Sequence, residues 1–518
     1  MTTSSWCRIA RRLLLSSLAF ALAQAGCATT PPEPVAPSTP SAPASSAPAP
    51  EASEDRVIAR NERFLIYKPR DGDTLRSIAQ DFRGDSGLYW EIADFNGVRA
   101  AQPDHMLVVP LQPINAVGVF GGGYQTVPIL AYHRFGEQSS RMEVSVTSFA
   151  AQLDYLAQND YRVVALRDLE GFLAGKHPLP ERAVVITMDD GYGSLYKYAF
   201  PLLREHGFPA TVFVYTDFIG ARDALSWAQM REMVDSGLID IQAHSKSHAN
   251  LSYRVPGETD ERYKERLDEE AHVPRDVLER GLPVKVDMFA YPYGDTNGSV
   301  LDVLRKRDYH LAVTVKPGGN AFFADPLLLR RSMVLGDQDL DSFKAKLRVY
   351  REMEGRSPEI RPPYGSELEL ELREGERALA FMHNARWGEA VPHWEVLNLL
   401  HPEQAAYADG LVEARTRAAH AVAEHLEAAQ HARKQGQTRR AAALYLSALS
   451  ADPGNVEAAQ ALRDIQEEGT RREYPPGQAT GVLLRDESKV VPKGAERDLD
   501  SAEKEGRPFS SPHVGKTP

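Results

Sequence analysis

Short apolar runs alternate with amphipathic stretches through the middle of the chain, from about residue 125 to 350. Eight runs have the length and composition of strands: Val127–Tyr132, Tyr161–Leu166, Ala183–Met188, Ala210–Tyr215, Ile239–Ala243, Met288–Tyr291, Leu311–Val315 and Leu328–Val334. Five stretches have apolar residues at helical spacing: Ser148–Gln158, Leu195–His206, Ser226–Ser236, Glu261–Arg280 and Ser299–Arg307. The regular strand-then-helix order predicts an α/β domain, with parallel strands in a sheet or barrel and the chemistry at their C-terminal ends.

A smaller pattern of elements lies between residues 64 and 111. A strand F-L-I-Y is followed by an Asp-Gly turn, a helix capped by Asp73 or Thr74, a second helix and a strand M-L-V-V-P. The pattern Y-x-x-x-x-G-D-T-L-x-x-I-A resembles a LysM domain, which we assign to residues 61–113. The resemblance implies a βααβ fold that binds glycans containing N-acetylglucosamine, such as peptidoglycan. The loop that would meet sugar consists of Asp71, Gly72, Asp73 and Thr74, and the same residues also make the turn and the cap.

Residues 371–465 are rich in alanine and predict a third, helical part. Small residues recur where a tetratricopeptide repeat places them, which allows paired helices to approach closely. These positions are Ala429, Gly436, Ala441, Tyr445 and Ala448 in one unit, and Ala378, Ala390, Trp394, Leu397 and Pro402 in a second, weaker one. A repeat of this kind suits a protein partner, and a plain helical hairpin is the alternative. The charged tail from 471 to 518 is predicted to be disordered.

The first 27 residues have the character of a targeting segment. Arg8, Arg11 and Arg12 precede an apolar stretch that is short for a membrane span. Cys27, in A-L-A-Q-A-G-C, resembles the lipid-acceptor cysteine of a bacterial lipoprotein, which implies a membrane anchor. Gln24 stands where that motif prefers leucine, and ordinary cleavage after Ala25 would instead release a free periplasmic or secreted protein. Either route predicts an exported, cell-envelope protein, with residues 28–60 as a Pro/Ala/Ser-rich linker.

Composition narrows the classes of function. The chain has 518 residues, of which 42% are hydrophobic, enough for more than one domain with a core. Its formal net charge of −12 argues against a nucleic-acid partner, because binding phosphates requires a basic surface.

Two adjacent carboxylates end the strand at Ala183–Met188, in the sequence V-I-T-M-D-D-G. Adjacent acids repel one another, so Asp189 and Asp190 predict a nearby cation. His244 and His248 follow another strand at a spacing that lets both imidazoles face one ion. With Asp190 they make a two-His, one-carboxylate set that leaves positions open for water and substrate. Zinc is the default divalent metal for these ligands, although cobalt, nickel or iron would also fit.

The motifs T-M-D-D-G, H-S-K-S-H and A-Y-P-Y-G at 290–294 resemble those of NodB-type polysaccharide deacetylases, carbohydrate esterase family 4. The resemblance implies a distorted seven-stranded (β/α) barrel over residues 124–350. By carry-over, Asp190, His244 and His248 are metal ligands, Asp189 is the general base, and the backbone N–H of Tyr293 helps to hold the oxyanion. The strand P-I-L-A-Y-H-R-F resembles the branch that deacetylates poly-β-1,6-N-acetylglucosamine.

Two family features are missing. Phe289-Ala290 stand where an arginine normally orients the base, and Arg330 is our candidate to pair with Asp189 instead. The late L-x-H motif, which supplies the general acid, is replaced by Leu329-Arg330-Arg331. We expect His133 to supply the proton, since it ends the first strand and opens onto the same face. His310 precedes a strand and is expected at the opposite end. The sequence R-P-P-Y-G at 361–365 matches the third motif more literally, but it follows the last strand, and we interpret it as a link.

The leading hypothesis is an exported, metal-dependent deacetylase of N-acetylglucosamine units in peptidoglycan or in poly-N-acetylglucosamine. The alternative is a non-catalytic scaffold in which LysM grips the wall and the helical repeats recruit a partner. Cleavage of glycosidic bonds is disfavoured, because Asp189 and Asp190 are neighbours and cannot flank a sugar bond.

Overall fold

The computed structural model describes residues 54–348, 350–351 and 361–482. The predicted leader, Cys27 and most of the linker therefore lie outside the described residues. The described residues form two compact units: residues 54–124 with 361–462, and the described residues from 125 to 351 with 463–482. Among the described helices, none combines the length and apolar character needed to cross a membrane.

The first unit begins with a small antiparallel sheet and its helices. Its elements are η1 (Glu54–Arg56), β1 (Val57–Arg60), β2 (Phe64–Tyr67), α2 (Leu75–Arg83), η2 (Ser86–Leu88), α3 (Tyr89–Asn96) and β3 (Leu107–Pro110). The strand order is β1-β2-β3, so the predicted βααβ order is present with β1 added at one edge. Thr74 caps α2 as expected, because its hydroxyl accepts from the Ser77 N–H in a capping box.

Helices form the rest of the first unit: α11 (Glu367–His383), α12 (Trp387–Leu400), α13 (Ala405–Lys434) and α14 (Thr438–Ala451), with the short hairpin β4 (Val119–Phe120) and β5 (Gly123–Gln125). The predicted alanines Ala378, Ala390, Ala429, Ala441 and Ala448 are all at 0% exposure, whereas Gly436, in the turn before α14, is exposed. Close helix approach at these positions is therefore observed, whereas membership in the repeat family stays a prediction.

The helices share a core with the small sheet. Phe64, Ile66 and Val108 from the sheet cluster with Leu370 and Val396 from α11 and α12. The segment 361–365 joins this core, since Tyr364 is fully buried and bonds to Met106 of the small domain. It is thus a packed part of the first unit rather than the simple link expected. The small sheet thus supplies apolar surface against which α11 and α12 pack.

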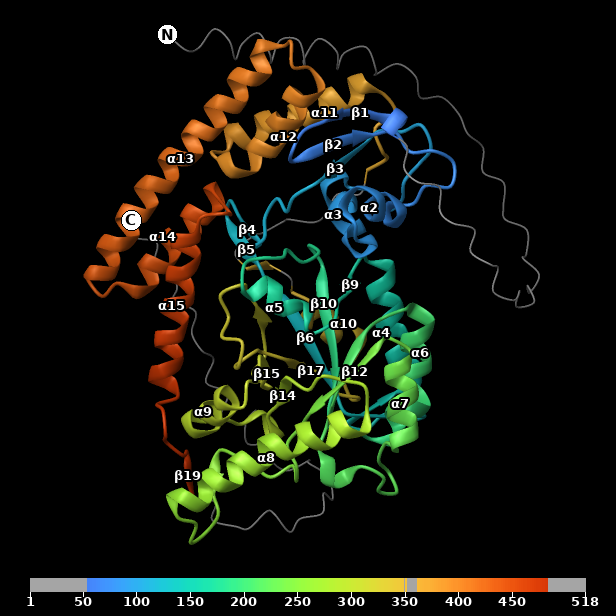
Figure 1. The fold of residues 1–518 in the computed structure, drawn as a ribbon, viewed down its shortest axis with the longest axis vertical. Coiled ribbons are helices and arrows are strands. Elements are labelled where there is room, and N and C mark those ends of the chain that lie inside the picture. The colour runs from blue at the N-terminus through green and yellow to red at the C-terminus, as the bar shows by residue number, and fades with distance from the viewer. Residues whose placement is uncertain (1–53, 349, 352–360, 483–518) are drawn as a thin grey trace, which may run out of the picture. The chain divides into compact units, whose positions relative to one another are not determined.

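The second unit has alternating strands and helices (Figure 1). Its strands are β6 (Val127–Tyr132), β7 (Arg134–Gly136), β8 (Glu143–Ser145), β9 (Arg162–Val163), β10 (Ala183–Met188), β11 (Ala210–Val214), β12 (Ile239–Ala243), β13 (Tyr253–Arg254), β14 (Met288–Ala290), β15 (Leu311–Val313), β16 (Gly319–Asn320), β17 (Ser332–Met333), β18 (Tyr350–Arg351) and β19 (Gly481–Val482). Its helices are α4 (Val146–Gln158), α5 (Asp168–Leu173), η3 (Leu195–Ala199), α6 (Phe200–His206), η4 (Thr216–Phe218), α7 (Trp227–Asp235), α8 (Asp260–Gly281), η5 (Pro292–Gly294), α9 (Gly298–Lys306) and α10 (Leu340–Lys346).

A curled sheet organises this unit and confirms the predicted α/β class. Its strands follow the order β15-β14-β12-β11-β10-β6, and each neighbouring pair is parallel. Leu329 bridges Val313 in parallel, and Ser332 of β17 pairs with Leu130 of β6. One segment thus connects the two edges, as a distorted barrel with seven strands requires. Most sheet residues are buried, because helices cover its outer face.

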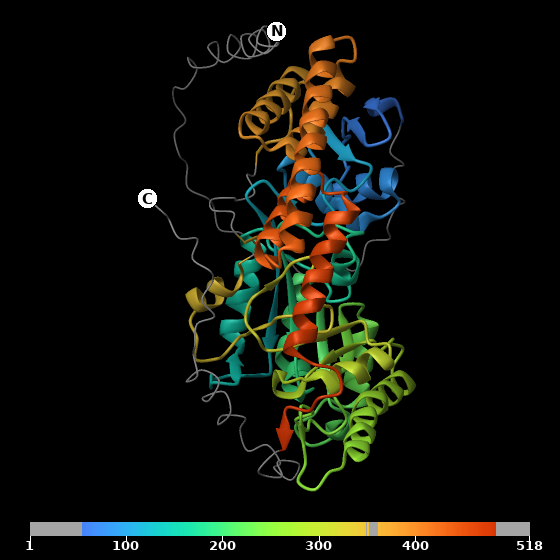
Figure 2. The same cartoon turned by 90° about the vertical axis from the view of Figure 1, so that its left-hand side faces the viewer.

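The C-terminal part of the second unit contradicts one prediction. Residues 471–482 were expected to be disordered, yet α15 (Val456–Glu473) continues to Glu473 and β19 pairs with β13. Figure 2 shows this segment running from α15 to β19. Thr480 donates its N–H to the Ser252 carbonyl at 2.9 Å, and Gly477 donates to Asp302 at 3.0 Å. Backbone hydrogen bonds to the domain therefore order a segment whose composition is polar.

Candidate functional site

A sharp turn at the end of β10 presents Asp189 and Asp190. The Asp189 N–H bonds to the Tyr132 carbonyl of β6 at 2.9 Å, which continues the sheet for one residue. Asp190 and Gly191 then both adopt positive φ, 74° and 78°. A Cβ on Gly191 would lie 3.0 Å from a Val214 methyl, so both the conformation and the space favour glycine here. The turn directs the two neighbouring carboxylates to different partners.

Asp189 is held by Arg331, which follows the strand segment at 329. Arg331 Nη1 and Nη2 lie 2.7 Å from Asp189 Oδ1 and Oδ2, respectively. The same guanidinium donates to the Thr314 carbonyl and to the Thr187 hydroxyl. The expectation that Arg330 would fill this role is wrong, because Arg330 instead donates to the Pro317 carbonyl near the surface. Adjacent residues of an extended segment point to opposite faces, so only one of the two arginines enters the barrel.

Asp190 lies against the two predicted imidazoles. Its Oδ1 is 3.4 Å from His244 Nε2 and 3.2 Å from His248 Nε2, and ligand atoms of the three residues all lie within 4.8 Å of one another. His244 Nδ1 lies 2.8 Å from the Ala290 carbonyl, a contact that requires a proton on Nδ1. In neutral His244 the lone pair on Nε2 therefore faces the carboxylate. Asp190 Oδ1 is buried and accepts no hydrogen bond from any described residue.

Two acceptors that face each other need a cation between them. A proton on an imidazole or a metal ion would serve, and the donor set of two nitrogens and one oxygen suits a divalent transition metal. The residues present therefore fit the implied metal. A second group of described residues also has its possible ligand atoms within 4.8 Å of one another: Glu170, Asp287 and His310. Asp287 and His310 immediately precede β14 and β15, so this group lies at the opposite ends of the strands, as expected for His310.

The loop that carries the histidines is shaped by Glu270 of α8. This buried carboxylate accepts the N–H groups of Lys246 and Ser247, both at 2.9 Å, and the Ser247 hydroxyl. Ser245 and His248 have positive φ, 66° and 60°, which is uncommon for residues with a Cβ. Strained backbone of this kind persists where surrounding contacts enforce it and is frequent at functional sites.

The local charges shift several pKa values. Burial opposes ionisation of both aspartates, but Arg331 and His244 outweigh it at Asp189 and keep its pKa below the ordinary value. At Asp190 the two imidazoles, which lie 3.4 Å and 3.2 Å from the carboxylate, lower the pKa further. Burial lowers the pKa of His133, against the opposing influence of Asp190 and Asp189. Both carboxylates are thus ionised and His133 is neutral at neutral pH.

Tyr293 lies in η5 with φ 61°, and its ring is 4.9 Å from that of His248. The structure therefore brings the A-Y-P-Y-G loop beside the two-histidine loop. His133 and Asp189 directly follow Tyr132 and Met188, which pair in the neighbouring parallel strands β6 and β10, so His133 lies at the same end of the sheet as the two aspartates. In the small domain, Asp71 and Gly72 are exposed, whereas Asp73 accepts from the Tyr67 hydroxyl and the Arg70 N–H, both at 2.8 Å. Asp73 is thus committed to the turn.

Sequence reasoning missed Arg331 and Glu270. The double arginine after Leu329 was a signal for the first, although the sequence alone could not say which arginine turns inward. Glu270 lies in the acidic stretch L-D-E-E of an amphipathic helix, where nothing separates it from the solvent-exposed Glu269.

The second unit is similar to known proteins. Residues 176–312 match the family described as polysaccharide deacetylase, so the chain contains a domain of this family. It is 29% identical to YxkH of Bacillus subtilis over 37% of this chain and 65% of that protein. It is 26% identical to the poly-beta-1,6-N-acetyl-D-glucosamine N-deacetylase of Escherichia coli K12, over 41% of this chain and 36% of that protein. The structure of IcaB from Ammonifex degensii is 31% identical, covers 43% of this chain and 96% of that chain, and gives a TM-score of 0.38. The chain thus spans less than two thirds of the length of the first two relatives.

Proposed function

Because the chain contains a polysaccharide deacetylase domain, we propose that it is a metal-dependent hydrolase that removes N-acetyl groups from N-acetylglucosamine units of a glycan outside the cell. The observation that carries the proposal is the pairing of Asp190 Oδ1 with two imidazole nitrogens, beside an Asp189 that is held at both oxygens. A scaffold that only grips glycan has no use for this arrangement.

Asp190, His244 and His248 would hold the metal, with zinc as the default. When bound, the ion would supply positive charge that polarises the acetamide carbonyl and makes water more acidic. The contact between His244 and the Ala290 carbonyl keeps Nε2 available as a ligand. Glu270 fixes the backbone between the two histidines and so sets their separation.

Asp189 acts as the general base that takes a proton from the attacking water. Its lowered pKa keeps it ionised, and Arg331 leaves each carboxylate oxygen a further lone pair with which to accept that proton. The Tyr293 backbone N–H helps to hold the developing oxyanion. His133 gives a proton to the departing amine. Since its lowered pKa leaves it neutral at rest, it must first take up the proton that Asp189 has removed from the attacking water, and it then passes this proton to the amine.

The substrate is either poly-β-1,6-N-acetylglucosamine or peptidoglycan. The named Escherichia coli relative supports the first polymer. The resemblance of residues 61–113 to LysM supports the second, or an anchoring role on the wall while the enzyme treats another polymer. We further propose that the chain is exported, that Cys27 carries a lipid anchor to a membrane, and that the helices recruit a protein partner.

Acetate release by the chain from residue 55 onward tests the function. Purified peptidoglycan and poly-β-1,6-N-acetylglucosamine are offered side by side, with metal stripped and restored, and Asp189→Asn serves as the inactive control. Metal-dependent release from one polymer alone would establish both activity and substrate class. No release from either polymer by folded, metal-loaded protein would reject both substrates and favour the scaffold.

A further inference from the structure

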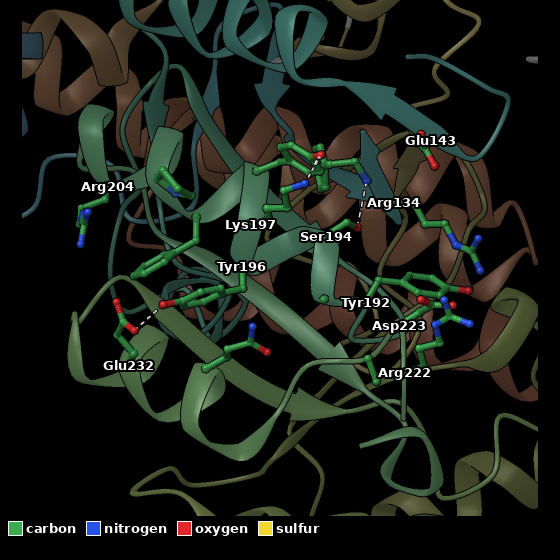
Figure 3. Close-up of a pocket in the computed structure, with 17 residues that line it drawn as sticks. Arg134, Glu143, Tyr192, Ser194, Tyr196, Lys197, Arg204, Arg222, Asp223 and Glu232 are labelled. Carbon is green, nitrogen blue, oxygen red and sulfur yellow. Dashed lines mark hydrogen bonds between the residues drawn. The ribbon is translucent and has the colours of Figure 1, made fainter. Parts of the chain in front are cut away.

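The groups of the proposed reaction lie at the C-terminal ends of the sheet strands, where a pocket of about 780 Å³ also opens (Figure 3). Arg134 and Tyr192 in the lining of this pocket follow the ends of β6 and β10, so the pocket belongs to the same end of the barrel. The opposite end carries a second cluster of ionisable side chains, none of which acts in the proposed reaction: Glu170, Asp287 and His310.

The N-terminal ends of two neighbouring strands bring Asp287 and His310 together. Asp287 precedes β14 and His310 precedes β15, and these strands pair in parallel with Met288 opposite Leu311. The His310 N–H donates to the Asp287 carbonyl at 2.7 Å. The Asp287 N–H donates to Oε1 of Gln242, a fully buried residue of β12, at 3.1 Å. Hydrogen bonds therefore fix the main chain that carries both side chains before any ligand binds.

Glu170 of α5 completes the cluster from a third element of the fold. His310 Nδ1 lies 3.4 Å from Glu170 Oε2 and 4.0 Å from Asp287 Oδ2. Both distances are longer than those of a good N–H···O hydrogen bond. The shorter one is close to the separation of two ligand atoms on a tetrahedral zinc ion, about 3.3 Å for metal–ligand bonds of about 2.0–2.1 Å. The three side chains are thus spaced to contact one cation.

Asp287 brings an unsatisfied oxygen to this cluster. Its side chain is 4% exposed, and its Oδ1 is buried and accepts no hydrogen bond from any described residue. A buried carboxylate oxygen without a partner is costly, and a bound cation would remove that cost. Lys285 Nζ lies 2.8 Å from Oδ2, but the lysine side chain is 67% exposed and can turn into solvent. The nearby Arg167 guanidinium is already engaged by Asp240 through Nε and Nη2.

We propose that Glu170, Asp287 and His310 bind a second divalent transition-metal ion, which stabilises the N-terminal end of the barrel. One imidazole nitrogen and two carboxylate oxygens suit Zn²⁺ and similar ions, whereas Mg²⁺ and Ca²⁺ prefer oxygen ligands alone. The Glu170 and His310 side chains are 38% and 36% exposed, which gives an ion access from solvent. The ion joins α5 to the starts of β14 and β15 in the folded chain. This role is structural and holds whether or not the chain releases acetate.

The test uses the full chain with Asp190→Asn and His248→Ala, which remove two candidate ligands of the active-site metal. Zn²⁺ titrated calorimetrically into this metal-stripped protein should still bind at one site. Adding Asp287→Asn should weaken that site by about tenfold or more, because a neutral amide is a poorer zinc ligand than a carboxylate. The matched control is Asp154→Asn, which neutralises a carboxylate of α4 that is 59% exposed. No remaining Zn²⁺ binding, or equal affinity in Asp287→Asn and the control, would overturn the proposal.

Substitution of Lys285 in the same protein gives a prediction of the opposite sign. If the cluster held only ion pairs between side chains, Lys285→Met would remove a contact and leave Zn²⁺ affinity unchanged. At a metal site it removes a competing positive charge, so Zn²⁺ should bind about tenfold more tightly. Zn²⁺ should also raise Tm further in Lys285→Met than in the protein without this change, since the ion binds the folded state. Unchanged or weaker Zn²⁺ binding, or Mg²⁺ bound as tightly as Zn²⁺, would contradict the assignment.

Discussion

Arg331 and Asp189, 142 residues apart in the sequence, form a two-point ion pair inside the barrel. Arg331 is 0% exposed and Asp189 is 2% exposed. A pair at this depth is costly to break, because the partner left behind is a charge without solvent or counter-charge. The pair also fixes the plane of the carboxylate that we propose as the base.

Replacing this arginine is expected to affect both stability and rate. Arg331→Met should lower the free energy of unfolding by about 3–5 kcal/mol. Arg331→Lys keeps the charge but loses the two-point contact, and we expect kcat to fall by about 100-fold with a smaller loss of stability. Urea unfolding and acetate release measure the two effects. Arg330→Met is the matched control, and an equal loss there would contradict the assignment.

The same pair predicts a dependence of stability on pH. The pKa of Asp189 is lower in the folded protein than in the unfolded chain, so the pair contributes stability above the unfolded value, about 4. This contribution is lost as the pH falls through the folded pKa. Unfolding followed from pH 7 to pH 2 should therefore show a loss below pH of about 4 that is smaller in Asp189→Asn. Identical profiles for the two proteins would refute this.

Metal binding should depend on the Asp190 group. Calorimetric titration of metal-stripped protein with Zn²⁺ is expected to show a site that Asp190→Asn and His248→Ala abolish. His310→Ala is the control, because His310 belongs to the other group of described residues that could hold a metal ion. Loss of the site in His310→Ala, with Asp190→Asn unaffected, would place the metal at the opposite end of the barrel.

Glu270 should act through the histidine loop. In Glu270→Gln the side chain can no longer accept all three hydrogen bonds as a carboxylate, so His248 is held less firmly. We expect Zn²⁺ affinity to fall about 10–100-fold. Glu269→Gln removes a neighbouring, exposed carboxylate whose contact is an ion pair with Lys246 at 3.7 Å. Equal affinity in the two variants would show that Glu270 has no such role.

His133 should be needed for proton transfer but not for metal binding. His133→Ala is expected to reduce kcat about 100-fold or more, because the leaving amine then lacks a positioned acid. Zn²⁺ affinity, measured in parallel, should remain within a fewfold of the parent. Acetate release at the full rate would assign the acid to another group.

A substitution at Gly298 tests whether the C-terminal segment is held against the start of α9. A Cβ at this position would lie 1.8 Å from the Pro475 carbonyl oxygen, so Gly298→Ala must displace the backbone near 475. We expect faster proteolysis within residues 474–482 and a lower Tm. Gly469→Ala, in α15 with nothing within 4 Å of the added methyl, should be neutral or stabilising. Unchanged proteolysis in Gly298→Ala would show that the segment is not held there.

Much of the architecture followed from the sequence, because apolar periodicity and turn residues are local signals. β6, β10 and β12 begin and end at the predicted residues, and Thr74 caps its helix as its type and position indicate. The candidate ligands were also visible, since Asp190 and His244 follow apolar runs and His248 stands four residues after His244. Side chains at the C-terminal ends of parallel strands meet at one face, and strand order alone is enough to predict their proximity.

Tertiary structure decided what depends on contacts between distant segments. The choice of Arg331 over Arg330 rests on which side chain faces inward after Leu329, and a shift of one residue reverses that direction. Glu270 differs from Glu269 only in the face of α8 that it occupies. The order of residues 471–482 comes from hydrogen bonds to Ser252 and Asp302, about two hundred residues earlier in the chain. Such partners leave no periodic trace in the sequence, because their pairing is fixed by packing rather than by local conformation.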